Sequence, residues 1–385
     1  MQNPLDSKLP HVGTTIFSVM SRLANETGAI NLSQGFPSFE PPDALLERFE
    51  YYLRHGANQY APMPGVPALL QAIADKTLRT QGRSLDSATE LTVSTGATEG
   101  LFSAITALVR PGDEVILLDP AYDAYEPAID LSGGRAVHVP LAIENDEFVV
   151  DWQPVADAIS ARTRAIVLNF PHNPTGAVID RDGLETLAGL LRDTAVYVVS
   201  DEVYEHIVFD DGRHHSVLSH DELWERSIVI SSFGKTFHAT GWKVGYAAAP
   251  AALTNEFRKV HQFTTFAVNT PAQCALADYV ESDPEFYLAL SSFYQQKRDL
   301  FCKLLEPSRL RLRPSRSTFF QVADYSEISE QADVDVARLW TTEHGVATIP
   351  LSVFCETPFS GCRLRFCFAK DDETLARAAA ILSEL

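Results

Sequence analysis

The most constraining feature of this sequence is a regular alternation, which begins near residue 90, between short apolar runs and segments long enough to form a helix. The apolar runs have the length of β-strands and are apolar on both of the faces that a strand presents. Strands of this kind belong to a mostly parallel sheet that helices cover on both sides. The runs predicted as strands are LTVST (91–95), EVILL (114–118), AIVLNF (165–170), VYVVS (196–200), SIVISS (227–232) and VGYAAA (244–249).

The two ends of the chain depart from this alternation. Residues 1–40 carry scattered apolar residues that cannot form a core alone, so we expect them to pack on the rest of the protein. After residue 305 the pattern becomes shorter and mixed, which predicts a second, smaller α+β unit. The predicted elements are helices within 251–300, strands at 319–325 and 363–369, a helix near 334–344 and a final amphipathic helix at 371–385.

Composition excludes several classes of protein. With 385 residues, 45% of them apolar, the chain has the length of two or three packed units, and a disordered chain is excluded. Its 31 basic and 51 acidic residues give a net charge of −20, which disfavours binding to duplex DNA. Five cysteines without a CxxC pair predict reduced thiols rather than a disulfide framework or a thiolate zinc site. The beginning of the chain lacks a basic flank followed by an apolar core, so we expect a cytoplasmic protein.

Polar side chains follow several predicted strands, at the sheet edge where ligands collect in α/β proteins. After 91–95, Gly96, Ala97 and Thr98 open a helix whose free N–H groups suit an anion, unless Thr98 is only a capping residue. Asn173, in the PHNPTG segment that follows 165–170, belongs either to a plain turn or to a site at this edge.

Asp201 and Lys235 follow two further strands. A carboxylate at the end of a buried strand is costly unless it is paired, so Asp201 either caps the next element or meets a bound cation. Lysines are ordinarily solvated, but in an apolar pocket the pKa of Lys235 would fall and its amine would become a nucleophile. The apolar neighbours of Lys235 are Phe233, Phe237 and Trp242.

Other templates for functional sites fail. The GKT at 234–236 resembles the end of a phosphate-binding P-loop, but that motif needs glycine where Val229 stands. GxGxxG after a strand, GxSxG and HExxH are absent from the sequence. His214, His215 and His220 cluster without carboxylates at ligand spacing, so we expect them in an exposed loop and expect no metal.

Taken together, these junctions resemble the fold-type I, class I/II aminotransferases, which use pyridoxal 5′-phosphate (PLP). The stretch SSFGKTFHATGWKVG (231–245) is similar to the lysine-attachment signature of the family, and NPTG (173–176) and DEVY (201–204) occur in the expected order. NLSQGFPSFEPP and ANQYAPMPGVPAL look closest to the methionine aminotransferase and kynurenine aminotransferase-like branch. The resemblance covers essentially the whole chain.

The resemblance implies a fold and a division into domains. The fold is α/β, with a three-layer, mostly parallel sheet in a large PLP-binding domain and a smaller α+β domain built from both chain ends. The large domain would span 41–290 and the small C-terminal domain 291–385. Residues 1–40 would form an N-terminal segment that packs on the small domain.

The resemblance also implies roles toward the cofactor. Lys235 would hold PLP through its amine and later move the proton between the substrate Cα and the cofactor. Asp201 would pair with the pyridinium nitrogen and keep it protonated. Tyr204 and Asn173 would hydrogen-bond the 3′-oxygen, and Tyr122 would stack on the ring. The residues implied to hold the phosphate are Ala97, Thr98, Ser232 and Lys243, the last at a position where many relatives have arginine.

Substrate contacts are implied in the same way. Arg365 would clamp the substrate carboxylate, helped by Gly35 and Asn173, and Arg363 is the competing choice. Phe17 resembles the aromatic residue that covers the substrate side chain in this branch, although it could equally pack on the small domain.

The implied activity is transamination by a ping-pong mechanism between an L-amino acid with a long uncharged or aromatic side chain, methionine first, and a 2-oxo acid. Tyr60 matches the tyrosine that reaches the phosphate of the neighbouring subunit, so a homodimer with shared active sites is expected. Two alternatives use the same scaffold: a carbon–sulfur β-lyase acting on cysteine conjugates, and a non-catalytic PLP-binding regulator, for which a basic nucleic-acid-binding module is missing.

Overall fold

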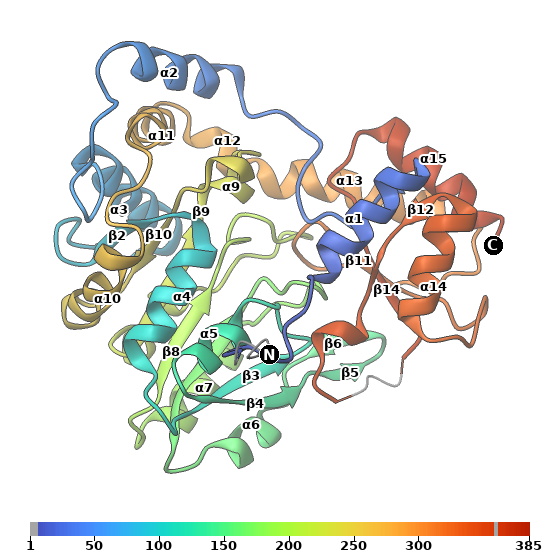
Figure 1. Cartoon of the computed structure of the whole chain (residues 1–385), viewed down its shortest axis with the longest axis horizontal. Coiled ribbons are helices and arrows are strands. Elements are labelled where there is room, and N and C mark those ends of the chain that lie inside the picture. Colours follow the sequence, from blue (N-terminus) through green and yellow to red (C-terminus); the bar gives the residue numbers. More distant parts are fainter. Residues whose placement is uncertain (1–6, 358–360) are drawn as a thin grey trace, which may run out of the picture.

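A seven-stranded sheet forms the centre of the protein in the computed structural model, which describes residues 7–357 and 361–385 (Figure 1). Strand β10 runs antiparallel to both of its neighbours, and the remaining pairings are parallel. The spatial order is β2 (Leu91–Ser94), β10 (Gly245–Ala248), β9 (Ser227–Ser232), β8 (Tyr197–Asp201), β7 (Thr163–Asn169), β3 (Glu114–Asp119) and β4 (Arg135–Pro140).

Both faces of this sheet are buried against helices. In β3, Val115 and Leu117 belong to one apolar cluster, while Ile116 and Leu118 belong to another, as the two-residue period of a strand requires. The first cluster includes residues of α4 (Gly96–Leu108), α5 (Tyr125–Leu131) and α10 (Ala251–Thr264). The second includes residues of α3 (Pro67–Gln81), α6 (Trp152–Ala158), α7 (Arg181–Leu191), α8 (Asp221–Trp224), α9 (Phe233–Thr236) and α11 (Thr270–Ser282).

A second, smaller group of elements lies beside the sheet, and its sheet is antiparallel (Figure 1). The strand order is β11 (Phe320–Asp324), β14 (Arg363–Cys367) and β13 (Ile349–Pro350). The helices are α13 (Leu290–Leu305), α14 (Asp333–Leu339), which continues into a π-helical turn at Trp340–His344, and α15 (Asp372–Ser383). Further regular elements are the helices α2 (Asp43–Arg54) and α12 (Pro284–Leu288) and the hairpin β5 (Ala142–Glu144) to β6 (Glu147–Val149).

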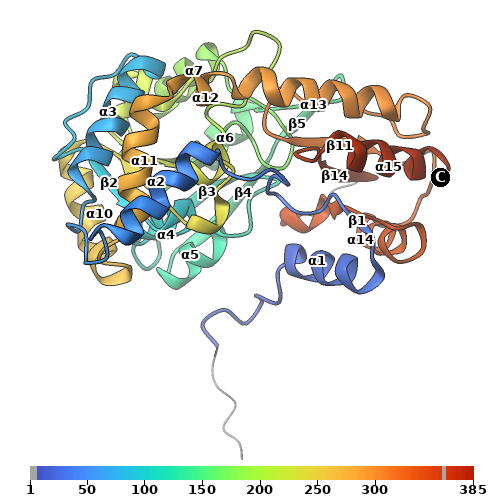
Figure 2. The same cartoon turned by 90° about the horizontal axis from the view of Figure 1, so that it is seen from above.

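The N-terminal segment packs on these C-terminal elements. Helix α1 (Ile16–Thr27) is capped by the Thr15 side chain, which accepts a hydrogen bond from the Ser18 N–H, and it ends at Gly28 in the left-handed conformation. Strand β1 (Ile30–Asn31) pairs with β12 (Val346–Ala347). Helix α1 packs against the π-helical turn Trp340–His344 at the end of α14 and against β12, so segments from opposite ends of the chain meet here (Figure 2).

The predicted strands are confirmed, with ends that differ by a few residues at most. Strand β4 and the β5–β6 hairpin were not predicted. Strand β4 lies at the sheet edge and most of its residues are only partly buried, so its composition does not show the continuous apolar run of the inner strands. The domain boundaries at 40 and 290 stay predictions; residues 1–6 and 358–360 within those ranges lie outside the described part of the chain.

The predicted exposed histidine loop is wrong for His214 and His220, and His215 is only partly exposed. The side chain of His220 is 13% exposed, and its Nε2 lies 3.2 Å from a carboxylate oxygen of Glu185. His214 is buried more deeply. Its side chain is 6% exposed, and Nε2 lies 2.6 Å from a carboxylate oxygen of Glu202, a partner that only the tertiary fold supplies. Across residues 7–357 and 361–385, no group of three or more histidine, cysteine or acidic side chains is arranged to hold a metal ion. In the same ranges, no helix combines the length and the apolarity that crossing a membrane would require.

Candidate active site

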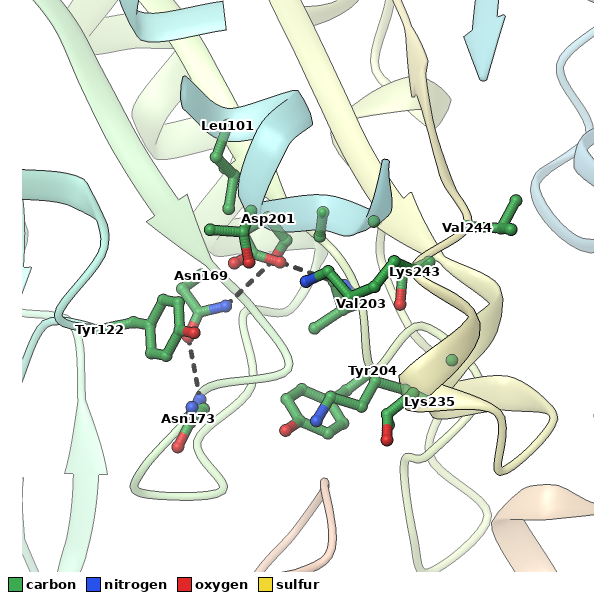
Figure 3. A pocket seen from close by; sticks show the side chains of 16 residues that line it. Leu101, Tyr122, Asn169, Asn173, Asp201, Val203, Tyr204, Lys235, Lys243 and Val244 are labelled. Atoms are coloured by element: carbon green, nitrogen blue, oxygen red, sulfur yellow. Dashed lines mark hydrogen bonds between the residues drawn. The ribbon is translucent and has the colours of Figure 1, made fainter. Parts of the chain in front are cut away.

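A cavity of about 180 Å³ lies where the carboxyl ends of the inner strands meet the beginning of α4 (Figure 3). Its wall combines side chains from the ends of β7, β8 and β9 with backbone from α4 and from the segment that follows α9. The predicted site residues that line it are Ala97, Thr98, Tyr122, Asn173, Asp201, Tyr204, Ser232, Lys235 and Lys243. Strand ends far apart in the sequence therefore converge on one space, as the topology of a parallel sheet predicts.

Lys235 places its amine in this cavity from the short helix α9. The Nζ donates a hydrogen bond to the carbonyl oxygen of Gly35 at 2.5 Å. It also lies 5.7 Å from the ring centre of Tyr204 and 5.5 Å from that of Phe319. Because the surrounding protein desolvates the ammonium, the pKa of Lys235 falls to about 8. Lys235 thus carries an amine that is partly uncharged near neutral pH.

Asp201 ends strand β8 and is 4% exposed. Burial raises the pKa of its carboxyl to about 6, although hydrogen bonds and the charge of Lys235 oppose this rise. Its Oδ2 accepts a hydrogen bond from the hydroxyl of Tyr125 at 2.7 Å, and its Oδ1 accepts one from the Val203 N–H at 3.3 Å. Such a carboxylate gains from meeting a cation in the cavity.

Two asparagines connect the backbone of Asp201 to the turn after β7. The side-chain amide of Asn169 donates to the carbonyl oxygen of Asp201 at 3.3 Å, and its Oδ1 accepts the N–H of Asn173 at 3.0 Å (Figure 3). Asn173 in turn offers its own Oδ1 to Arg365. Asn169 was not predicted as a site residue, although a polar side chain at the end of a buried strand is the signal that identified Asp201.

One end of the cavity is built to receive an anion. Helix α4 begins at Gly96, which has a φ of +68°, and a Cβ there would lie 3.3 Å from Nζ of Lys243. A Cβ on Gly245 would come within 3.0 Å of the Ala97 nitrogen, so the three segments approach closely. The free N–H groups at the start of a 13-residue helix and the nearby ammonium together favour a negatively charged group.

Arg365 is fully buried next to this cavity, on strand β14. Its Nη1 donates to Oδ1 of Asn173 and its Nη2 to the carbonyl oxygen of Ser33, both at 2.8 Å. Its guanidinium carbon lies 4.0 Å from the ring centre of Phe320, and within the described residues its Nε has no hydrogen-bond partner. Burial lowers the pKa of Arg365 to about 10. A buried guanidinium whose hydrogen bonds go to neutral oxygens is suited to a carboxylate.

Arg363 lies elsewhere. Its guanidinium is 3.9 Å from carboxylate oxygens of both Asp146 and Asp324, next to the β5–β6 hairpin. Arg365 does not line the cavity either, but its hydrogen bond to Asn173 places it directly behind the cavity wall, whereas the two carboxylates near Arg363 belong to residues that do not line the cavity.

The remaining predicted residues lie around the cavity or away from it. The ring of Phe17 does not line the cavity; its centre lies 6.5 Å from that of Tyr122, 5.6 Å from that of Phe354 and 5.2 Å from the guanidinium carbon of Arg365, so either predicted role fits. Tyr60 is 84% exposed and packs edge-on against Phe266, near which Phe263 is 86% exposed. This aromatic surface does not line the cavity.

Comparisons with known proteins agree on one family. A sequence model described as aminotransferase class I and II matches residues 27–382. The chain is 53% identical to the methionine aminotransferase of Escherichia coli over 385 residues, which cover 100% of this chain and 99% of that protein. It is 36% identical to a kynurenine–oxoglutarate transaminase of Dictyostelium discoideum, over 95% of this chain and 93% of that protein.

Solved structures give the same result. An Escherichia coli protein with a methionine aminotransferase function superposes with a TM-score of 0.96 at 53% identity, covering 98% of this chain and 99% of that chain. The N-succinyldiaminopimelate aminotransferase of Mycobacterium tuberculosis superposes with a TM-score of 0.96 at 37% identity, with the same coverage of both chains.

Proposed function

This chain belongs to the class I and II aminotransferases, and on that basis we propose that it transfers the amino group of methionine, or of another amino acid with a long uncharged or aromatic side chain, to a 2-oxo acid with the help of PLP. The observation that carries this proposal is a single cavity that combines the desolvated amine of Lys235, the buried carboxylate of Asp201 and an anion-binding helix start. These are the three groups that the aldehyde, the ring nitrogen and the phosphate of PLP require.

The residues present fit the cofactor. Gly96 has a positive φ, and its Cβ position lies close to Lys243. Any side chain at position 96 would therefore fill the space between the start of α4 and Lys243, where the phosphate would bind. Burial of Asp201 without a directly bonded cation leaves its carboxylate in need of one, and a protonated ring nitrogen would supply it. When bound, PLP supplies an acceptor for the electron pair that the substrate Cα releases with its proton.

Each residue has a defined task in this proposal. Lys235 binds the cofactor aldehyde and then moves the proton at the substrate Cα, for which a pKa of about 8 is suited near neutral pH. Asp201 holds the proton on the ring nitrogen. Tyr204 and Asn173 hydrogen-bond the ring oxygen, and Tyr122 packs on the ring face. The phosphate would be held by Ala97, Thr98, Ser232 and Lys243.

Arg365 binds the substrate carboxylate through its two terminal nitrogens, with the backbone of Gly35 and the side chain of Asn173 beside it. Phe17 would cover the substrate side chain together with Tyr122. An apolar cover of this kind favours methionine and aromatic donors, and it agrees with methionine and kynurenine, the substrates named for two of the relatives.

We also propose a homodimer in which Tyr60 reaches the phosphate of the neighbouring subunit. Its support is the exposed aromatic surface of Tyr60, Phe263 and Phe266, which would be covered by a second copy.

The test is a half-reaction. Purified protein with PLP should show the absorbance of the bound cofactor and lose it on addition of methionine, and a 2-oxo acid should restore it. Lys235→Ala should reduce turnover by several orders of magnitude, whereas Lys259→Ala, at an exposed position on α10, should leave it unchanged. A wild-type protein that neither binds PLP nor forms an oxo acid from any amino acid would refute the proposal.

A further inference from the structure

Tyr125, the first residue of α5, contacts the proposed cofactor site from behind Asp201. Its side chain is 2% exposed, and its hydroxyl donates to Oδ2 of Asp201 at 2.7 Å. We propose that Tyr125 is a positioning residue, which holds the carboxylate of Asp201 in one orientation and in its ionised form for the ring nitrogen of PLP. This inference rests on the proposed function, and it adds a residue that does not line the cavity.

The surroundings of Tyr125 fix where its hydroxyl points. The ring belongs to the apolar cluster on the α4 and α5 side of the sheet, together with Leu101 and Ile129. It packs edge-on against Tyr122 at 5.7 Å, and its N–H donates to the Tyr122 carbonyl at 3.3 Å. A ring packed in this way has little freedom to turn, so the hydroxyl stays on Asp201.

The hydrogen bonds on Asp201 divide its two oxygens between two elements. Oδ2 accepts from Tyr125 on α5, and Oδ1 accepts from the Val203 N–H just beyond β8. Two donors on different oxygens prevent the carboxylate from rotating. The lone pairs that remain are the ones available to a cation in the cavity.

The hydrogen bond from Tyr125 also favours the ionised form of Asp201. Burial raises the pKa of Asp201, and the Tyr125 hydrogen bond is the largest influence that opposes the rise. Burial also raises the pKa of Tyr125 well above 10, so the hydroxyl stays protonated and remains a donor. The other titratable groups that act on this pair are Lys235, Glu202, Tyr122 and Tyr204. Without the hydroxyl, Asp201 would therefore take up a proton at a higher pH.

A purely structural role is the competing explanation, because a buried tyrosine also fills space. Tyr125→Phe keeps the ring and removes only the hydrogen bond. Tyr294→Phe is the matched control, since Tyr294 is 0% exposed and its hydroxyl lacks a hydrogen-bond partner among the described residues. Asp201→Asn, alone and combined with Tyr125→Phe, shows whether the effect passes through the carboxylate.

The experiment uses the full-length holoenzyme, dialysed against decreasing concentrations of PLP at several pH values, with the bound fraction read from cofactor absorbance. Loss of a hydrogen bond to a charged group should weaken PLP binding by about 10- to 100-fold in Tyr125→Phe. The acidic limb of the kcat profile should move to higher pH, and Tyr294→Phe should match the wild type in both measurements.

Two results would overturn the inference. One is a Tyr125→Phe protein with wild-type PLP affinity and an unmoved acidic limb. The other is an equally large loss of affinity when Tyr125→Phe is added to Asp201→Asn, because the effect would then not pass through the carboxylate. Failure of the proposed function is a separate outcome, since the wild-type protein itself would then bind no PLP.

Discussion

Replacing Asp201 by asparagine should make the cofactor-free protein more stable while it removes catalysis. The carboxyl of Asp201 has a pKa of about 6 in the folded protein, against an ordinary value of 3.8, because it is buried. At about 1.4 kcal/mol per pH unit, keeping it ionised in the fold costs about 3 kcal/mol of unfolding free energy. Asparagine carries no charge, and its one side-chain oxygen can still accept the hydrogen bond from Tyr125. Its amide nitrogen then faces the Val203 N–H, whose longer hydrogen bond of 3.3 Å is lost, so about 3 kcal/mol is the upper limit of the gain.

The sign of the effect follows from the direction of the pKa change. A carboxyl whose folded pKa lies above its unfolded value destabilises the fold at high pH, and the cost disappears as the pH falls from about 6 to 3.8. The increase in unfolding free energy of Asp201→Asn over the wild type should therefore be largest above pH 7 and vanish near pH 4. For 385 residues, about 3 kcal/mol corresponds to a rise of about 4 °C in the unfolding midpoint.

Thermal unfolding of PLP-depleted protein across this pH range is the assay. Asp193→Asn, at an exposed position after α7, is the control and should change stability by less than about 0.5 kcal/mol. The reasoning is refuted if Asp201→Asn is less stable than the wild type at pH 7.5, or if its gain does not depend on pH. With PLP bound, the wild type should be more stable than Asp201→Asn, because the protonated ring nitrogen then compensates the cost of burying the Asp201 carboxylate.

Three further predictions follow from other contacts. Gly96→Ala should lower the unfolding free energy by about 1–2 kcal/mol and weaken PLP binding, because Gly96 has a φ of +68°. Gly189→Ala, in open space on α7, should lower neither the unfolding free energy nor the PLP affinity. Thermal unfolding and PLP titration check both variants. Arg365→Lys should raise the KM for methionine by about 10- to 100-fold with a smaller change in kcat, because lysine cannot make two parallel hydrogen bonds to a carboxylate. An unchanged KM in steady-state kinetics would exclude Arg365 as the residue that binds the substrate carboxylate. Burial lowers the pKa of His138, but the hydrogen bond to Asp119 and the negative charges of Asp119, Glu126 and Glu356 together raise it above 6.5. The stabilisation by protonated His138 is present at pH 6 and is lost as the pH rises through the folded pKa, so His138→Asn should cost more stability at about pH 6 than at about pH 8.5. Equal losses in unfolding experiments at both pH values would contradict this.

The inner strands could be predicted because burial on both faces leaves a continuous apolar run in the sequence. Strands β7, β8 and β9 carry this pattern, and their ends place Asp201 and Lys235 at one edge of the sheet. Strand β4 could not be predicted in this way, since an edge strand with partly buried residues has no such run. The sheet positions the site, so the part of the fold that was predictable is also the part that carries the candidate chemistry.

Contacts that depend on tertiary packing could not be predicted from sequence patterns. Arg363 and Arg365 share one face of a strand, so their alternation cannot separate them; only the position of the cavity along β14 does. The hydroxyl of Tyr125 reaches a carboxylate 76 positions away, and His214 finds Glu202 through the fold. Such pairings leave no local signal.

The two hydrogen bonds of Arg365 make substrate binding depend on the assembly of three distant segments. The arginine lies on β14, one acceptor is the carbonyl of Ser33 beyond β1, and the other is Asn173 in the turn after β7. A fragment without the first 40 residues would keep every cavity-lining residue, since the lining begins at Gly96, yet it would leave one nitrogen of the guanidinium unsupported. Binding of the amino acid therefore depends on contacts between the two ends of the chain and its centre, and the hydrogen bond from Lys235 to the Gly35 carbonyl depends on the same N-terminal segment.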